Sequence, residues 1–216
     1  MVSRFRNKIK LITYTFDPMR RKILSLFPLL LFAEKSKAYP KEERRSYKNS
    51  CLYLENLGFI DKGKMPQQPD KIPRYDDPEP LGVNFFRLEV HNQNFENLTL
   101  KRTFFGRSEI ANCSFANSDL SESNLCWNDF INVKFDRALL TRADLRSSIF
   151  NKVSFLGTDL SEADLRRSTY KNCNFQNANL TKAIATLSQA KSLKLTKQQQ
   201  KQVNWTSDEG AEPDGG

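Results

Sequence analysis

The chain has little of what most catalytic and metal sites are built from. Its 216 residues include one histidine, His91, four cysteines and eight glycines. A single histidine excludes His-based metal clusters and argues against the Ser-His-Asp and Cys-His arrangements of nucleophilic catalysis. The few glycines form no phosphate-binding loop, and no pair of carboxylates stands apart as general acid and base. We therefore expect no enzyme activity, no metal and no cofactor.

The chain also lacks a hydrophobic run that could span a membrane. Its longest mostly apolar stretch, residues 23–33, is interrupted by Pro28, and a spanning helix needs about twenty apolar residues. Arg20, Arg21 and Lys22 precede this stretch, and Ser36-Lys37-Ala38 follow it as a small-x-small site. This order is typical of a secretory signal peptide. We expect residues 1–38 to be that signal.

Two alternatives to this N-terminal prediction stay open. The apolar stretch could instead be an ordinary amphipathic or core helix, and translation could start at Met1 or at Met19. With a signal peptide the protein is expected to be exported, to the periplasm or the extracellular space. Without one it is expected to be cytoplasmic.

The net charge of +9 does not indicate a nucleic-acid-binding surface. Residues 1–38 hold nine basic and two acidic side chains, and the rest of the chain holds 25 basic and 23 acidic ones. The excess of positive charge therefore belongs to the N-terminus, as a targeting segment would explain, and not to a face that neutralises phosphates. We expect no nucleic-acid partner.

A strict five-residue period runs through the middle of the chain. From residue 85 to residue 180 every fifth residue is apolar or aromatic, and neither a helix nor a strand has this period. The residue types at these positions repeat every twenty residues, so four groups of five make one full coil, and the next coil stacks on it. Stacked coils would lie about 4.8 Å apart. The core residues that it predicts are Phe95, Phe115, Phe135, Phe155 and Phe175 on one side, and Leu100, Leu120, Leu140, Leu160 and Leu180 on another.

Several of these groups, such as Ser118-Asp119-Leu120-Ser121-Glu122 and Ala163-Asp164-Leu165-Arg166-Arg167, resemble the pentapeptide-repeat family. The resemblance implies an all-β solenoid, a right-handed quadrilateral β-helix of about five coils. In it the central residue and the small residue two before it point inward, and the other three point outward. For function it implies architecture and binding rather than a shared chemistry.

The flanks of the repeat are expected to cover its open ends. We predict an N-terminal helix and cap over residues 39–60, a Pro-rich connector over 61–82, the β-helix over 83–183, a cap helix over 184–204 and a disordered acidic tail over 205–216. Cys113 and Cys173 fall on inward positions, too far apart to bridge. Cys51 and Cys126 are placed outside the core, where they would meet only if the N-terminal segment folds over the coils.

The outward positions differ from face to face. The face with the Leu centres alternates in charge through Arg102, Glu122, Arg142, Glu162 and Lys182, which predicts a structural ladder. Another face has an asparagine column, Asn92, Asn112, Asn132 and Asn172, interrupted by Lys152, and a small acidic column, Glu89, Glu109 and Asp129.

One further face is unusual because it carries large aromatic and arginine side chains at outward positions. Such a surface is normally either covered or used by a partner. One interpretation is that the helix of residues 41–57 covers it, and the other is that it binds a protein partner or a second copy of the chain. The candidate residues are Phe86, Arg87, Phe104, Arg107, Trp127, Arg146, Arg166 and Arg167.

We expect an exported, rigid binding or scaffold protein, monomeric or homodimeric, for a protein or cell-envelope partner that the sequence does not identify. A first alternative is a cytosolic inhibitor or protector of a type II topoisomerase that imitates DNA, as the resemblance to the family allows. That role needs a strongly negative surface, and residues 81–187 hold 13 basic and 11 acidic side chains. A second alternative is an immunity or effector-type interaction protein, for which no residue discriminates.

Overall fold

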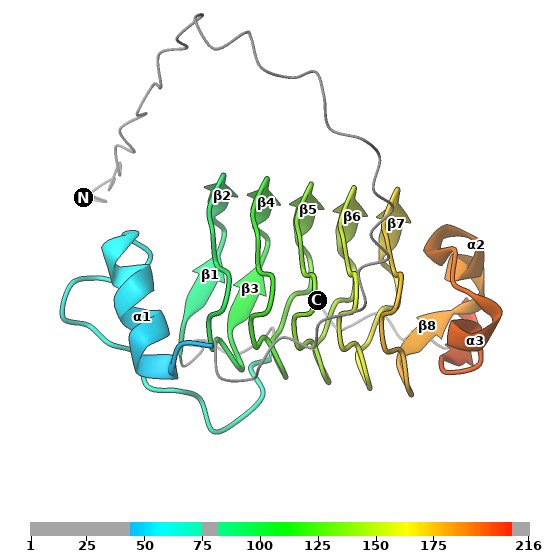
Figure 1. Cartoon of the computed structure of the whole chain (residues 1–216), viewed down its shortest axis with the longest axis horizontal. Coiled ribbons are helices and arrows are strands. Elements are labelled where there is room, and N and C mark those ends of the chain that lie inside the picture. Colours follow the sequence, from blue (N-terminus) through cyan, green and yellow to red (C-terminus); the bar gives the residue numbers. More distant parts are fainter. Residues whose placement is uncertain (1–43, 75–81, 209–216) are drawn as a thin grey trace, which may run out of the picture. The chain divides into compact units, whose positions relative to one another are not determined.

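The computed structural model describes residues 44–74 and 82–208 (Figure 1). The predicted signal peptide, the choice between Met1 and Met19 and the last eight residues of the predicted tail lie outside these described residues. Within the described residues, no helix has the length and apolarity needed to cross a bilayer.

The repeat folds as a β-solenoid of about six turns, where about five were predicted. Five short parallel strands stand in a row along one side, in the order β2-β4-β5-β6-β7, and β1 pairs with β3 on another side (Figure 1). Partners in these pairs are twenty residues apart, as in Val90↔Ile110, which confirms the twenty-residue coil. The strands are β1 (Asn84–Phe86), β2 (Glu89–His91), β3 (Phe104–Gly106), β4 (Glu109–Ala111), β5 (Asp129–Ile131), β6 (Ile149–Asn151) and β7 (Thr169–Lys171).

The interior is a stack of large side chains, one layer per coil. All ten predicted core residues are buried. Phe115 stacks on Phe95 with ring centroids 4.8 Å apart and on Phe135 at 5.3 Å. These separations follow the coil spacing and lie in the range where offset aromatic pairs attract. The repeat of Phe every twenty residues is therefore a continuous apolar column.

Every corner is turned by a residue in the left-handed conformation. The second residue after each centre has a positive φ, from +51° at Arg107 to +63° at Gly157. Among these corner residues from 87 to 182, only Gly157 is a glycine. A non-glycine residue costs about 1–2 kcal/mol in this region. The corner amides offset that cost by pairing with the next coil, as when the Glu122 amide donates to the Thr141 carbonyl at 2.9 Å.

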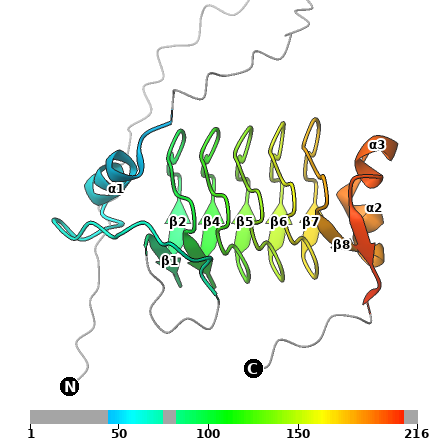
Figure 2. The ribbon, with the colours of Figure 1, turned by 90° about the horizontal axis from the view of Figure 1, so that it is seen from below.

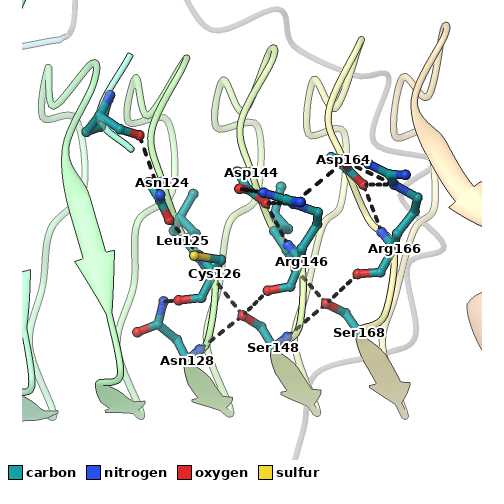
Figure 3. Close-up of polar contacts among 12 residues, drawn as sticks. Asn124, Leu125, Cys126, Asn128, Asp144, Arg146, Ser148, Asp164, Arg166 and Ser168 are labelled. Carbon is teal, nitrogen blue, oxygen red and sulfur yellow. Dashed lines mark hydrogen bonds and ion pairs between the residues drawn. The ribbon is translucent and has the colours of Figure 1, made fainter. Parts of the chain in front are cut away.

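The small inward residues satisfy the backbone at the corners. The Ser148 hydroxyl donates to the Leu125 carbonyl at 2.9 Å and accepts the Asn128 amide at 3.0 Å, while the Ser148 amide donates to the Ser168 hydroxyl (Figure 3). Asn128, which stands where a small residue is expected, also forms hydrogen bonds with the backbone, through its longer side chain. Its side-chain oxygen accepts the Ser108 amide, and its side-chain nitrogen donates to the Cys126 carbonyl.

The alternating charges on the face with the Leu centres form ion pairs over its first part. Glu122 is 7 % exposed and contacts Arg102 at 2.7 Å, Arg142 at 3.3 Å and Lys101 at 3.5 Å. Burial would raise the pKa of its carboxyl, but the hydrogen bond from Arg102 and the three positive charges outweigh this, so its pKa lies below the usual value. No ion pair between described residues extends the ladder to Glu162.

The asparagine column is structural as well. Asn112 and Asn132 have φ of +55° and +53°, and the Asn132 side-chain amide donates to the Asn112 side-chain oxygen at 2.8 Å. Asparagine tolerates the left-handed region better than most residues do, which explains its use at this corner.

Helix α1 (Tyr47–Asn56) closes one end of the interior (Figures 1 and 2). Cys51 and Leu54 are buried in the same core as the coil centres, and Phe59, just after the helix, lies with its ring centroid 5.4 Å from those of both Phe85 and Phe95. The placement of Cys51 outside the core is therefore wrong, because it lies on the inner face of the helix. It forms no disulfide with Cys126; both thiols are free and buried.

The described part of the connector, residues 61–74, lies along the first coils. The Arg102 side chain donates to the Pro69 carbonyl at 2.9 Å, and the Asn124 side chain donates to the Pro73 carbonyl at 3.4 Å. The connector thus runs across the outside of the coils, held by side chains at outward positions.

The C-terminal cap is built differently from the single helix predicted over 184–204. It comprises β8 (Ile184–Thr186), the 3-10 turn η2 (Leu187–Gln189), α2 (Ala190–Leu193), α3 (Lys197–Gln200) and β9 (Asn204–Thr206). Lys194 in the left-handed region ends α2. Strand β9 pairs in parallel with β8, so residues 205 and 206 belong to a strand and not to a tail.

The left-handed corners can be tested at Ser147, which has φ +54°. Ser147→Val should be less stable than Ser147→Gly by about 1–2 kcal/mol, since a branched side chain is strained at positive φ whereas glycine is not. Urea unfolding would measure the difference. Ser154→Val is the matched control, because Ser154 is an outward serine in a β-bridge, without a positive φ. Equal stabilities of the Ser147→Val and Ser147→Gly variants would contradict this account.

Candidate partner-binding surface

The eight candidate residues lie on one wall of the coils, here called the Arg wall, whose inward centres include Phe85, Phe105, Leu125, Leu145 and Leu165. The structure separates them into two groups. Phe86, Arg87, Phe104, Arg107 and Trp127 belong to the first three coils, and Arg146, Arg166 and Arg167 to later ones. The two groups have different surroundings.

Arg146 and Arg166 are engaged in a ladder of ion pairs with the aspartates two residues before them. Arg146 donates to Asp144 at 2.9 Å, Arg166 donates to Asp164 at 2.7 Å, and Arg146 also reaches Asp164 of the next coil at 3.8 Å (Figure 3). Hydrogen bonding to Asp164 raises the pKa of the Arg166 guanidinium, which stays charged. Arg146 therefore links two neighbouring coils, whereas Arg166 pairs within its own coil, and sequence reasoning assigned neither role.

Arg167, the third member of the later group, lies beside the C-terminal cap. It borders a hollow of about 530 Å³ together with Lys171, Ser188 and Asp208. The Ser188 hydroxyl already donates to the Asp208 carboxylate at 2.7 Å.

Phe104 is the one large aromatic residue of the group that is buried, with 3 % exposed. Phe86 packs against it at a centroid distance of 5.8 Å. Gly106 makes this possible, since a Cβ there would lie 3.0 Å from the Phe104 ring and 3.1 Å from the Phe86 ring. The helix over 41–57 was one expected cover for this wall, but α1 packs on the end of the interior instead. Trp127 stays 49 % exposed and Phe86 38 %.

A shallow groove of about 360 Å³ follows the corner between the Arg wall and the sheet β2-β4-β5. One rim of this groove, the basic rim, consists of Arg87, Arg107 and Trp127, which also interact within the chain: the Arg87 guanidinium lies 4.9 Å from the centre of the Phe86 ring. Leu88 and Ser108 lie at its base.

The opposite rim, the acidic rim, consists of Glu89, Glu109 and Asp129, which are paired in register on β2, β4 and β5. His91 contacts Glu109 at 3.0 Å. Sequence reasoning recognised this acidic column but placed it on a separate face. The sequence does contain a pattern that links the two rims. Each acidic residue comes two positions after a residue of the basic rim, with one corner of the coil between them.

The groove offers no reactive group. Within residues 44–74 and 82–208, no set of three His, Cys, Asp or Glu side chains could hold a metal ion. Burial, with a smaller contribution from Asp144, raises the pKa of the Cys126 thiol on the same wall to about 12, so this cysteine is not a nucleophile near neutral pH. The arrangement is suited to binding.

The different burial of the two aromatic residues leads to a prediction. Phe104→Ala should lower the free energy of unfolding by about 3 kcal/mol, because it leaves a cavity beneath Phe86. Trp127→Ala should change it by less than about 1 kcal/mol, because half of its surface is already exposed. Chemical denaturation of both variants checks this. A large loss of stability in Trp127→Ala would show that this side chain belongs to the packed structure.

Comparison with known proteins agrees with the repeat. A family model described as pentapeptide repeats, in eight copies, matches residues 129–167 and 158–191. No curated protein sequence matches the chain.

Solved structures that resemble the chain do so over about half of its length. A pentapeptide-repeat protein of the Arabidopsis thaliana thylakoid lumen is 23 % identical to this chain, with a TM-score of 0.35. The match covers 44 % of this chain and 63 % of the Arabidopsis protein, so this chain spans less than two thirds of that protein's length. Rfr23 from the cyanobacterium Cyanothece 51142 is 18 % identical over 47 % of this chain and 83 % of its own, also with a TM-score of 0.35. QnrB1, a plasmid-mediated fluoroquinolone resistance protein, is 11 % identical over 48 % of this chain and 72 % of its own, with a TM-score of 0.31.

The twenty-residue coils, the stacked inward Phe and Leu residues and the eight matched repeats agree with one another. Residues 129–191 of this chain therefore consist of pentapeptide repeats.

Proposed function

We propose that the protein is an exported, non-catalytic binding module that presents the groove and the exposed aromatic residues of the Arg wall to a protein or cell-envelope partner. The single observation that carries this proposal is Trp127, 49 % exposed beside Arg107 at the edge of the groove. Tryptophan and arginine are the residues most enriched among those that dominate binding energies at protein interfaces.

The coils supply a rigid platform for this surface. Backbone hydrogen bonds join each coil to the next, as in Phe105 to Asn124 at 2.7 Å and Leu125 to Asp144 at 2.7 Å. The rim side chains stand on these paired segments, so their positions are largely set before a partner arrives. A surface ordered in advance loses less entropy on association.

Imitation of DNA, the first alternative, has less support. It requires a surface with a strong excess of negative charge. On the Arg wall, Asp144 and Asp164 are neutralised by Arg146 and Arg166. On the face with the alternating charges, Glu122 is surrounded by three positive side chains. No feature of the described residues favours an immunity or effector role over a general binding role.

Binding through the groove can be tested by affinity capture from the native host with the full-length protein as bait. Trp127→Ala should lose a specifically captured partner, because it removes the largest exposed side chain of the site. Leu52→Ala is the matched control: Leu52 is 41 % exposed on α1, away from the groove. Capture that is unaffected by Trp127→Ala, or equally reduced by Leu52→Ala, would contradict the proposal.

Export is tested separately by fractionating the native host and sequencing the N-terminus of the protein. The expected result is a chain that begins near Tyr39, found outside the cytosol, because cleavage would follow Ser36-Lys37-Ala38. Recovery of the uncleaved chain only from cytosol would contradict export, and would leave the binding role to be judged by the capture experiment.

A further inference from the structure

We propose that the groove associates with the same groove of a second copy of this chain, the two copies lying side by side with their coils running in the same direction. This inference rests on the proposed function, since it names the occupant of the same surface. It is drawn from the arrangement of charge around the groove and from the symmetry that this arrangement allows.

The two rims carry opposite charges in equivalent places. Arg87 and Glu89 line the groove from opposite sides of the corner of one coil, and Arg107 and Glu109 do so on the next. Successive coils are about 4.8 Å apart, so the basic and acidic rims are parallel rows with the same spacing. The acidic row has like charges as nearest neighbours along the sheet, Glu89↔Glu109↔Asp129. Such pairs are unfavourable unless positive charge lies close to them.

A twofold axis parallel to the stacking direction would set both rows against opposite charge at once, in addition to the contacts that Arg107 and Glu109 make within their own chain. Rotation about this axis keeps each coil level with its counterpart and brings the basic rim of each copy against the acidic rim of the other. Arg107 of each copy would then face Glu109 of the other. Such an interface is self-complementary, as a twofold contact requires.

The other simple twofold arrangement is disfavoured by the same charges. An axis perpendicular to the stacking direction would run the two copies in opposite directions and place basic rim against basic rim. Like charges in contact across an interface are strongly unfavourable. The charge pattern therefore selects the parallel arrangement.

An apolar contact between Ile149 of one copy and Trp127 of the other would lie next to the charged pairs. Ile149, 49 % exposed, follows Asp129 in register in the next coil. In the parallel arrangement it lies one coil beyond the level of Trp127 of the other copy, about 4.8 Å along the axis, within reach of an indole ring. Two Trp127–Ile149 contacts, related by the twofold axis, would bury apolar surface next to the charged pairs.

The contact follows one corner over a few coils, so it is smaller than the roughly 1,200 Å² typical of stable complexes. We therefore expect a weak dimer whose population rises with concentration. Its charged pairs are accessible to solvent, so salt should weaken it. Sedimentation velocity of the full chain, at low and high ionic strength, measures both effects.

Charge exchange provides the decisive test. Arg107→Glu leaves this part of the groove with only negative side chains, and Glu109→Arg leaves it with only positive ones. Each variant alone should sediment as a single chain, because its rims repel those of an identical copy. A mixture of the two should associate, because both contacts between unlike copies are then attractive.

Two control variants separate this pairing from a general effect of charge. Lys152→Glu and Glu162→Arg make the same changes of charge on exposed corner residues that do not line the groove, with φ of +57° and +58°. They should leave self-association unchanged. Glutamate already occupies a left-handed corner at Glu162, so Arg107→Glu introduces no new backbone strain.

Three results would overturn the inference: a wild-type chain that stays single at all concentrations, a single-charge variant that dimerises as the wild type does, or a mixture of the two variants that fails to associate. A wild-type protein that sediments as a single chain but captures a different partner through Trp127 would overturn this inference alone and leave the proposed function standing.

Discussion

The structure depends on the pairing of each coil's backbone with the coils on either side. The Leu120 amide donates to the Leu139 carbonyl at 2.8 Å, and the Leu139 amide in turn donates to the Ser118 carbonyl at 2.9 Å. This ladder requires every turn to close after the same number of residues, since a longer or shorter turn would leave buried backbone groups without partners. The left-handed corners, the small inward residues and the apolar centres all follow from that requirement.

The ends of the ladder must be closed by groups that can replace a missing coil. At the C-terminal end, two glutamine side chains do this: Gln189 donates to the Leu165 and Ser168 carbonyls, and Gln199 to the Phe175 and Ala178 carbonyls. At the N-terminal end, α1 and Phe59 cover the last aromatic layer, and the Ser50 hydroxyl accepts the Thr99 amide. Covered ends protect the coils against pairing with unrelated strands.

Because the interior is determined by the repeat, the outward positions are left to vary, and this is where function can reside. Part of the Arg wall is used by the fold itself, in the Asp144–Arg146 and Asp164–Arg166 pairs. Over the first coils the same wall carries an exposed tryptophan, and at its corner with the sheet lies a groove with one basic and one acidic rim. A single repetitive scaffold thus presents a stabilising surface and a binding surface side by side.

The sequence by itself determined the period and the inward residues, because a side chain that recurs every five residues is sorted inward or outward by the closure of the coil alone. It also located the candidate wall, since outward positions can be counted. It did not reveal that Phe104 is buried by Phe86, that Cys51 belongs to the core, or that the cap is two short helices and a strand pair. Only the tertiary structure decided these, together with the joining of the Arg wall and the acidic column into one groove. They depend on contacts across a corner, between coils or between the coils and their caps, where neighbours in space are not neighbours in the repeat.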